Sequence, residues 1–301
     1  MAGRILADDP ADADAKTEAA LDDVRRRLTE ARIGPLTTVR SKHYVSVGDA
    51  AEGFMKLILE DCEQLARDYL SHFRLRKFPV HLPEGRMIVV MFQDDRPFRR
   101  FFHLQGGVGV PALTGLYDRK TNALHVFDWR NVPMASRASH QYIHTLSHEG
   151  THQLSFNTGL LRRDGDVPLC IVEGLGTYGE ARQSGGHSDL GRLNLERLDD
   201  LARRQRQVSW IPLRELLTHD EVLRAGSIAR VLLAYAQSWL LVHYLLNEPE
   251  VLPRFRDYLK AILPRQNSRH RLDDAQAHLG DLDKLDTALR AYAVRLQMST
   301  P

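Results

Sequence analysis

The pattern of apolar residues changes character once along this chain of 301 residues. The runs that predict strands lie between residues 41 and 128, whereas beyond Ser136 apolar residues recur at helical spacing. Two segments predict strands, SKHYVSVG at 41–48 and RMIVVMF at 86–92. GLYD and ALHVFDW flank a polar turn at 119–122, which predicts a hairpin. The sequence therefore predicts an α+β fold, with a small mixed N-terminal sheet followed by a mostly helical half.

Most of the remaining sequence has helical periodicity. Helices are expected at 17–32, 49–73, 95–103, 137–157, 168–183, 189–206, 212–218, 228–247, 250–263 and 282–297. Residues 1–20 are rich in Ala and Asp and predict a flexible lead-in, and the Gly-rich residues 103–115 predict a loop. No repeat or linker divides the rest. We therefore expect a single domain over 21–300, with a sheet-bearing half at about 36–135 and a helical half at about 136–300.

Composition excludes several classes of protein. Lysine and arginine total 41 against 39 aspartate and glutamate, a net charge of +2, which argues against a strongly basic nucleic-acid binder. Arginines outnumber lysines 34 to 7, but they are interleaved with acids, so we expect no nucleic-acid partner. An arginine-rich nucleic-acid binder is a minor alternative, which salt-dependent retention on DNA or RNA would reveal. Two cysteines are too few for a disulfide scaffold or a thiolate zinc module.

One segment, at 228–246, is long enough to cross a membrane. It carries Arg230, Gln237, Ser238 and His243, and polar groups in the middle of a span are costly in lipid. A buried core helix is therefore expected, and no membrane span. The first twenty residues lack the basic start and apolar run of a secretory signal. A cytoplasmic location is expected if the sequence is complete.

The motif that points to chemistry is HEGTH at 148–152. On a helix, residues four apart lie on one face, so the imidazoles of His148 and His152 can bind one Zn²⁺. Glu149 can reach a metal-bound water as a general base. The next expected helix starts near Pro168 and carries Glu173, with 20 residues between it and His152. Two helices joined by a loop can bring this carboxylate to the histidines, and two His with one Glu form a known zinc set.

Other residues compete for the role of third ligand. Glu180 and Asp166 are nearby acids that can replace Glu173 as the donor. The helix that carries Glu173 also contains three glycines within two turns, at 174, 176 and 179, and each costs roughly 0.5–1 kcal/mol relative to alanine. Close packing of this helix against the HEGTH helix would explain these glycines.

The segments HEGTHQLSFN and PLCIVEGLGTYGE together resemble the gluzincin metallopeptidases, and most closely the uncharacterised peptidase-MA-like bacterial group. Weaker similarity extends over about residues 36–296. The resemblance implies that His148, His152 and Glu173 are zinc ligands and that Glu149 is the general base. It departs at Thr177, where many gluzincins have an acidic residue that orients a histidine. Glu180 is the candidate for that support.

The resemblance implies a zinc-dependent peptidase that acts on peptides or proteins through a metal-activated water. It places Tyr235 where such enzymes carry a hydrogen-bond donor for the oxyanion, with a core aromatic as the alternative; Tyr178 and His243 are secondary candidates. The Gly-rich loop lacks the acidic element with which one gluzincin branch grips a free amino terminus, which favours an endopeptidase over an aminopeptidase. An extended substrate is expected to pair with an edge strand at 123–128. The alternative function is a zinc-binding scaffold or binding module without peptidase activity.

Overall fold

The fold is known from a computed structural model that describes residues 10–103, 114–131, 135–181 and 190–299. Most of the expected Gly-rich loop at 103–115 lies outside these residues. The described chain is a mixed α+β protein, with a five-stranded sheet in the N-terminal half and mostly helices in the C-terminal half, as the sequence predicts. It divides into two compact units, one of residues 1–67 and 81–154 and the other of residues 68–80 and 155–301.

The first unit holds the sheet. Its strands are β1 (Thr37–Arg40), β2 (Tyr44–Gly48), β3 (Met87–Phe92), β4 (Gly115–Asp118) and β5 (Ala123–Phe127), and its helices are α1 (Pro10–Glu30), most of α2 (Glu52–Leu75), α3 (Asp95–Phe101), the 3-10 turn η1 (Trp129–Asn131) and most of α4 (Ala135–Asn157). The strand order is β1-β2-β3-β5-β4. Strands β2, β3 and β5 run parallel, and an antiparallel strand flanks them on each side.

The expected strands at 41–48 and 86–92 and the hairpin at 115–129 are confirmed as β2, β3 and the β4–β5 pair. The hairpin turn covers 119–122, where Asn122 adopts a left-handed conformation with φ of 56°. Strand β1 has no counterpart in the sequence prediction. It is four residues long and at best half-buried, so it shows no alternation that could identify it.

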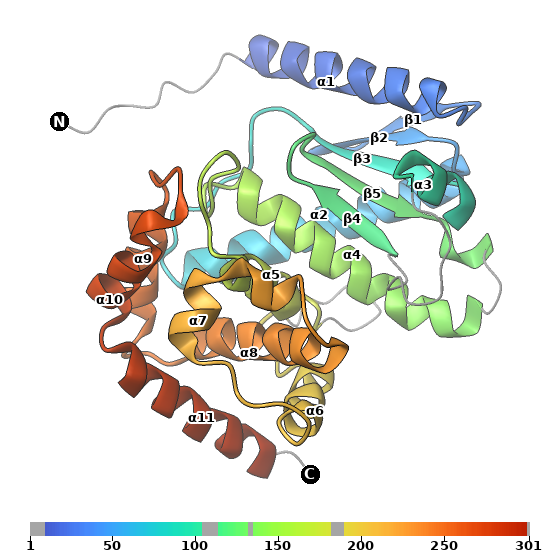
Figure 1. Ribbon diagram of the computed structural model, residues 1–301. Helices are drawn as coiled ribbons and strands as arrows, with labels where there is room; N and C mark the ends of the chain where they lie inside the picture. The colour runs from blue at the N-terminus through green and yellow to red at the C-terminus, as the bar shows by residue number, and fades with distance from the viewer. Residues whose placement is uncertain (1–9, 104–113, 132–134, 182–189, 300–301) are drawn as a thin grey trace. The chain divides into compact units, whose positions relative to one another are not determined.

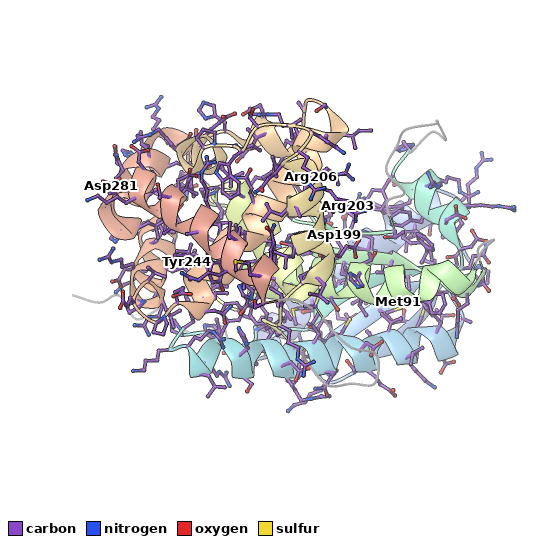
Figure 2. The ribbon with its side chains drawn as sticks, turned by 90° about the horizontal axis from the view of Figure 1, so that it is seen from below. Met91, Asp199, Arg203, Arg206, Tyr244 and Asp281 are labelled. Carbon is purple, nitrogen blue, oxygen red and sulfur yellow. The ribbon has the colours of Figure 1, made fainter. Side chains whose placement is uncertain are left out.

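The three central strands are buried along their whole length, which shows that both faces of the sheet are covered. Val45, Val90 and Phe92 belong to an apolar cluster with Leu21 and Leu28 of α1, and Phe98 and Phe101 of α3 extend it. Figure 1 shows α1 on one side of the sheet and α4 on the other. Val89 and Met91 alternate with that cluster along β3 and are also buried. Met91 is labelled in Figure 2.

Two boundaries differ from the sequence prediction. Helix α1 begins at Pro10 and buries Ala13 and Thr17, so the assignment of residues 10–20 to a flexible lead-in is wrong. The helix that carries the HEGTH motif groups with the sheet as far as Leu154, although residues beyond 135 were assigned to the helical half. The reason is its packing. The side chain of Gln153 donates to the β3 carbonyl of Ile88 at 3.0 Å, and Gly150 lies against Leu65 of α2.

The second unit is helical. Its elements after α4 are α5 (Leu169–Gly179), α6 (Leu195–Arg204), α7 (Leu213–Thr218), η2 (Asp220–Leu223), α8 (Ile228–Asn247), α9 (Leu252–Ile262), η3 (Ser268–His270), α10 (Arg271–Leu279) and α11 (Leu282–Met298). Figure 2 labels Asp281, whose side chain caps α11 by accepting from the backbone N–H groups of Asp283 and Lys284.

Helix α10 is not predicted from the sequence. It has no long apolar stripe, and it buries Arg271 and Asp274 beside Ala275 and Leu279. Both buried charges are paired, Arg271 with Asp166 and Asp220, and Asp274 with Arg265. Such pairing allows a helix with few apolar residues to lie in a core.

Helix α8 forms the centre of this unit. By length and composition it passes as a candidate membrane span, but most of its side chains are buried inside the protein, as the sequence analysis expects of a core helix. Trp239, Leu240 and Leu241 are fully buried. Gln237 satisfies its buried amide by bonding the backbone of Ile211 through both its oxygen and its nitrogen.

The reason for glycine at position 174 differs from the expected one. A Cβ added to Gly174 would lie 2.5 Å from the carbonyl oxygen of Ser238 and 2.5 Å from a methyl group of Val242. Both neighbours belong to α8. Gly174 is therefore required by the close approach of α5 to α8, and the expectation that it serves packing on the HEGTH helix is wrong at this position.

Candidate metal centre

Helix α4 carries the two histidines on one face. His148 and His152 are one turn apart, and their Nε2 atoms converge to 3.0 Å. Their rings are perpendicular, with centroids 4.6 Å apart. His152 is buried and His148 is half-buried. The helical spacing read from the sequence thus produces two nitrogen donors that point to one place.

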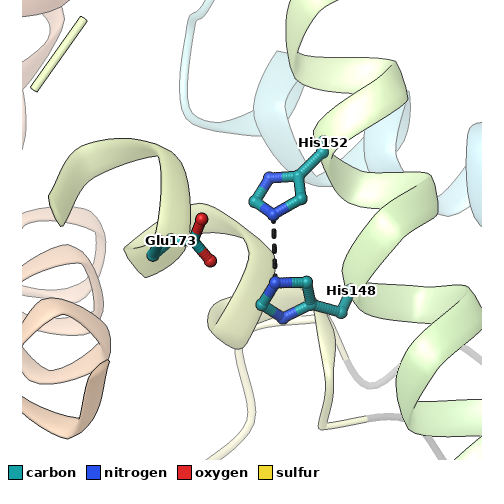
Figure 3. Close-up of side chains that lie close together, drawn as sticks. All are labelled: His148, His152 and Glu173. Carbon is teal, nitrogen blue, oxygen red and sulfur yellow. Dashed lines mark hydrogen bonds between the residues drawn. The ribbon is translucent and has the colours of Figure 1, made fainter. Parts of the chain in front are cut away.

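Helix α5 carries the third donor. It begins directly after Pro168, whose fixed φ suits a helix start, and Glu173 lies in its second turn. One ligand atom from each of His148, His152 and Glu173 lies within 4.8 Å of the others. Figure 3 shows the carboxylate of Glu173 facing the two imidazoles. Two nitrogens and one carboxylate oxygen in such a group can bind a metal ion, as the sequence predicts.

The competing acids are engaged elsewhere. The Glu180 carboxylate receives two hydrogen bonds from the guanidinium of Arg197, at 2.6 and 2.8 Å, and one from Asn194 at 2.9 Å. Asp166 receives two from Arg271, at 2.7 and 2.8 Å. Glu180 is therefore paired with Arg197, and Asp166 shares Arg271 with Asp220, whereas Glu173 is the acid that joins the histidines.

Glu149 lies between the two histidines in sequence, and its carboxylate contacts the sheet. Its Oε2 accepts a hydrogen bond of 2.8 Å from the backbone N–H of Tyr117 in β4. An anionic acceptor makes this bond stronger than one between neutral groups. The contact was not foreseen from the sequence, because any residue at position 117 except proline supplies a backbone N–H.

Strand β5, at 123–127, pairs with β3 on one side and with β4 on the other. The expectation that 123–128 forms an edge strand is therefore wrong. Among the described strands, β4 is the outer one on this side of the sheet. The hairpin itself was predicted, but which of its strands pairs with β3 depends on a contact distant in sequence.

Tyr235, the expected oxyanion donor, lies on α8 and is half-buried. It lies one turn before Ser238, the residue whose carbonyl approaches Gly174. Its role in catalysis stays a prediction.

The two secondary candidates lie in a buried network of the second unit. The hydroxyl of Tyr178 bonds Nε2 of His72 at 3.0 Å, and the hydroxyl of Tyr292 bonds Nδ1 of His243 at 2.8 Å. Burial, with a smaller contribution from the nearby charge of Arg76, lowers the pKa of His72 to about 3 and that of His243 to about 4. Tyr178 and His243 thus have structural hydrogen bonds of their own.

The two cysteines, Cys62 and Cys170, are free and buried. Burial raises the pKa of the Cys170 thiol well above its usual range, so it stays protonated. A protonated thiol is a poor metal ligand. This agrees with a site made of nitrogen and oxygen donors.

A comparison with known protein families gives a match over this part of the chain. Residues 142–265 match the model of a family described as a protein of unknown function (DUF1570). The matched segment is less than half of the chain, but it includes Glu149 and the three candidate ligands. A comparison with curated proteins gives no match.

Proposed function

We propose that this protein is a zinc-dependent peptidase, with His148, His152 and Glu173 as the metal ligands and Glu149 as the general base. The observation that carries the proposal is the convergence of the three ligand atoms within 4.8 Å. The HExxH spacing and the resemblance to gluzincins add to it, since they place a carboxylate directly beside the first ligand.

Zinc fits this donor set. Two nitrogen ligands at 2.0–2.1 Å from a tetrahedral zinc ion are about 3.3 Å apart, and the two Nε2 atoms here are 3.0 Å apart. Two imidazoles with one carboxylate leave a fourth position open, which is typical of catalytic zinc sites. Harder ions such as Mg²⁺ prefer sets made only of oxygens.

A bound zinc ion would supply a Lewis acid that polarises the scissile carbonyl and lowers the pKa of a coordinated water. The remaining chemistry belongs to the chain. The Glu149 carboxylate accepts a proton from the attacking water and passes it to the nitrogen of the leaving amine. Tyr235 donates a hydrogen bond to the oxyanion as the tetrahedral intermediate forms.

The substrate class follows from the surroundings of Glu149. Its carboxylate bonds the backbone of β4, which is the outer described strand on its side of the sheet. An extended peptide that adds to such a strand can bond its remaining outward backbone groups, since the Tyr117 N–H is already held by Glu149, and its scissile bond is carried near the base. We therefore propose an endopeptidase that binds its substrate as an added strand.

The test is the Glu149→Gln variant, which keeps the size of the side chain and removes the base. Metal content should match that of the wild type after purification without added metal, while cleavage of a peptide library should fall about 100-fold to 10,000-fold. Unchanged cleavage by Glu149→Gln would refute the mechanism.

The scaffold alternative predicts another result. A wild-type protein that binds one zinc ion per chain but cleaves no peptide in a broad library would be a binding module. A His148→Ala variant is the control for the metal, because it should lose both the ion and any cleavage.

A further inference from the structure

The β4 strand touches helix α4 at the carboxylate of Glu149. The N–H of Tyr117 donates to Oε2 of Glu149 at 2.8 Å, although Tyr117 stands opposite Leu124 in the β4–β5 ladder. In an antiparallel pair, alternate residues direct their N–H groups away from the partner strand. Tyr117 is such a residue, and its outward N–H is satisfied by a side chain of the helix.

A second contact lies one helical turn earlier on α4. Thr145 precedes Glu149 by four residues, and its hydroxyl lies 2.5 Å from the hydroxyl of Thr114, which immediately precedes β4. A Cβ added to Gly115 would lie 2.7 Å from the Cγ2 methyl of Thr145 and 3.2 Å from the carbonyl oxygen of His125. Glycine at 115 therefore lets the strand approach the helix closely.

These contacts fix the helix along the strand at two points. Residues 145 and 149 are about 6 Å apart along α4, and residues 114 and 117 are about 10 Å apart along β4. A glutamate side chain has three rotatable bonds and samples many rotamers when it is unrestrained. The N–H of Tyr117 holds one carboxylate oxygen, Oε2, and thereby restricts the rotamers of the whole side chain.

We infer that strand β4 is the positioning element for Glu149, with the Tyr117 N–H orienting the carboxylate and the Gly115–Thr145 contact setting the distance between strand and helix. The inference rests on the proposed function in so far as it assigns a catalytic consequence to the contact. Tyr117 acts through Glu149, so it is a positioning residue. Its essential group is the backbone N–H and not the phenol.

The first experiment compares Tyr117→Pro with Tyr117→Val. Both variants remove the phenol, but only proline removes the N–H, and an outer strand tolerates proline where the N–H points away from the ladder. We expect Tyr117→Pro to lower kcat at least tenfold relative to Tyr117→Val, with equal KM and equal metal content. An equal or higher kcat in Tyr117→Pro would overturn the inference, a higher one by showing that the bond restrains the base instead of preparing it.

The second experiment changes the distance between strand and helix. Gly115→Ala should lower kcat because its Cβ collides with Thr145 Cγ2. Adding Thr145→Ser removes that methyl and keeps the hydroxyl that meets Thr114, so the double variant should recover much of the lost kcat. A double variant as impaired as Gly115→Ala alone would contradict the assigned contact.

A third measurement needs no turnover. Amide hydrogen exchange at Tyr117 should be slow in the wild type and in Glu149→Gln, which keeps an oxygen acceptor, and at least tenfold faster in Glu149→Ala. Exchange that is equally fast in all three proteins would disprove the contact itself. If the wild type cleaves no peptide while this pattern holds, the proposed function fails and the positioning of Glu149 by β4 stands.

Discussion

Glu149 on α4 and three acids on or beside α5, Asp166, Glu173 and Glu180, carry the same chemical group and have different neighbours. Glu173 faces two imidazoles, whereas Glu180 and Asp166 each face an arginine, and Glu149 faces a backbone N–H. A carboxylate that is already neutralised by an arginine gains less from a cation. Whether a carboxylate can bind a metal therefore depends more on the group that it contacts than on its residue type.

The Glu173→Gln variant should bind zinc at least tenfold more weakly than the wild type, because a neutral amide replaces the anionic ligand. The fold should remain, since Glu173 is only half-buried. A zinc titration monitored by calorimetry gives the dissociation constant. Unchanged affinity would remove Glu173 from the ligand set.

The Glu180→Gln variant is the matched control on the same helix. Arg197 would lose the closer of its anionic partners in a buried setting, since only 6% of the Glu180 side chain is exposed and the Asp200 carboxylate lies 4.0 Å from the guanidinium. The free energy of unfolding should fall by about 3 kcal/mol while zinc affinity stays unchanged. Urea unfolding measures the first quantity, and weaker zinc binding would show that Glu180 supports the site.

At the scale of elements, the distance between two packed helices decides which side chains fit at their contact. Gly174 of α5 lies against the backbone of α8, whereas Gly53 of α2 has open space where a Cβ would be added. Gly53 is the second residue of its helix, where glycine costs less than it does inside a helix, so packing at Gly174 has to outweigh the larger propensity gain of alanine there. The space around the added Cβ therefore distinguishes two helical glycines that the sequence alone does not distinguish.

Alanine at these two positions should have opposite effects. Gly53→Ala should raise the free energy of unfolding by up to about 0.5 kcal/mol, because alanine loses less backbone entropy in a helix and Gly53 lies in the first turn. Gly174→Ala should lower it by about 1–3 kcal/mol, because a methyl group is forced against Ser238 and Val242. Denaturant melts of both variants check the signs, and stabilisation by Gly174→Ala would contradict the assigned packing.

At the scale of the whole molecule, buried histidines couple stability to pH. Burial lowers the pKa of His125 and His243 to about 4 and that of His72 to about 3. An unfolded histidine titrates near 6.5. The stability from these neutral histidines is complete above that value and is lost progressively as pH falls towards the folded values, because the unfolded chain binds the protons first.

The free energy of unfolding should therefore fall between pH 7 and pH 5 by about 2 kcal/mol for each of these histidines. Urea unfolding at a series of pH values measures the slope. In the control variant His243→Gln an amide replaces the imidazole as partner of Tyr292, and the slope should fall by roughly one third of the histidine contribution. A wild-type free energy that is flat from pH 7 to pH 5 would refute the prediction.

The sequence predicted the elements with strong periodicity and missed those without it. Helices α2, α4 and α8 were located within a few residues, because their apolar faces are long. Strand β1 is too short to alternate, and α10 is held by the paired charges of Arg271 and Asp274. Neither kind of element leaves a periodic signal.

Local sequence rules are enough to identify two of the candidate ligands and to locate the helix of the third. A helix places residues four apart on one face, so His148 and His152 converge wherever that helix lies, and Pro168 starts the helix that carries Glu173. These are local rules, which hold without knowledge of distant contacts.

The other features of the site come from tertiary contacts. It assigned Glu180 and Asp166 to arginines, put β4 outside β5, gave Gly174 to α8, and bonded Glu149 to the backbone of Tyr117. Each of these facts is a contact between segments far apart in the chain. Such contacts depend on how the elements pack, and the backbone N–H that holds Glu149 is the same in almost every residue type.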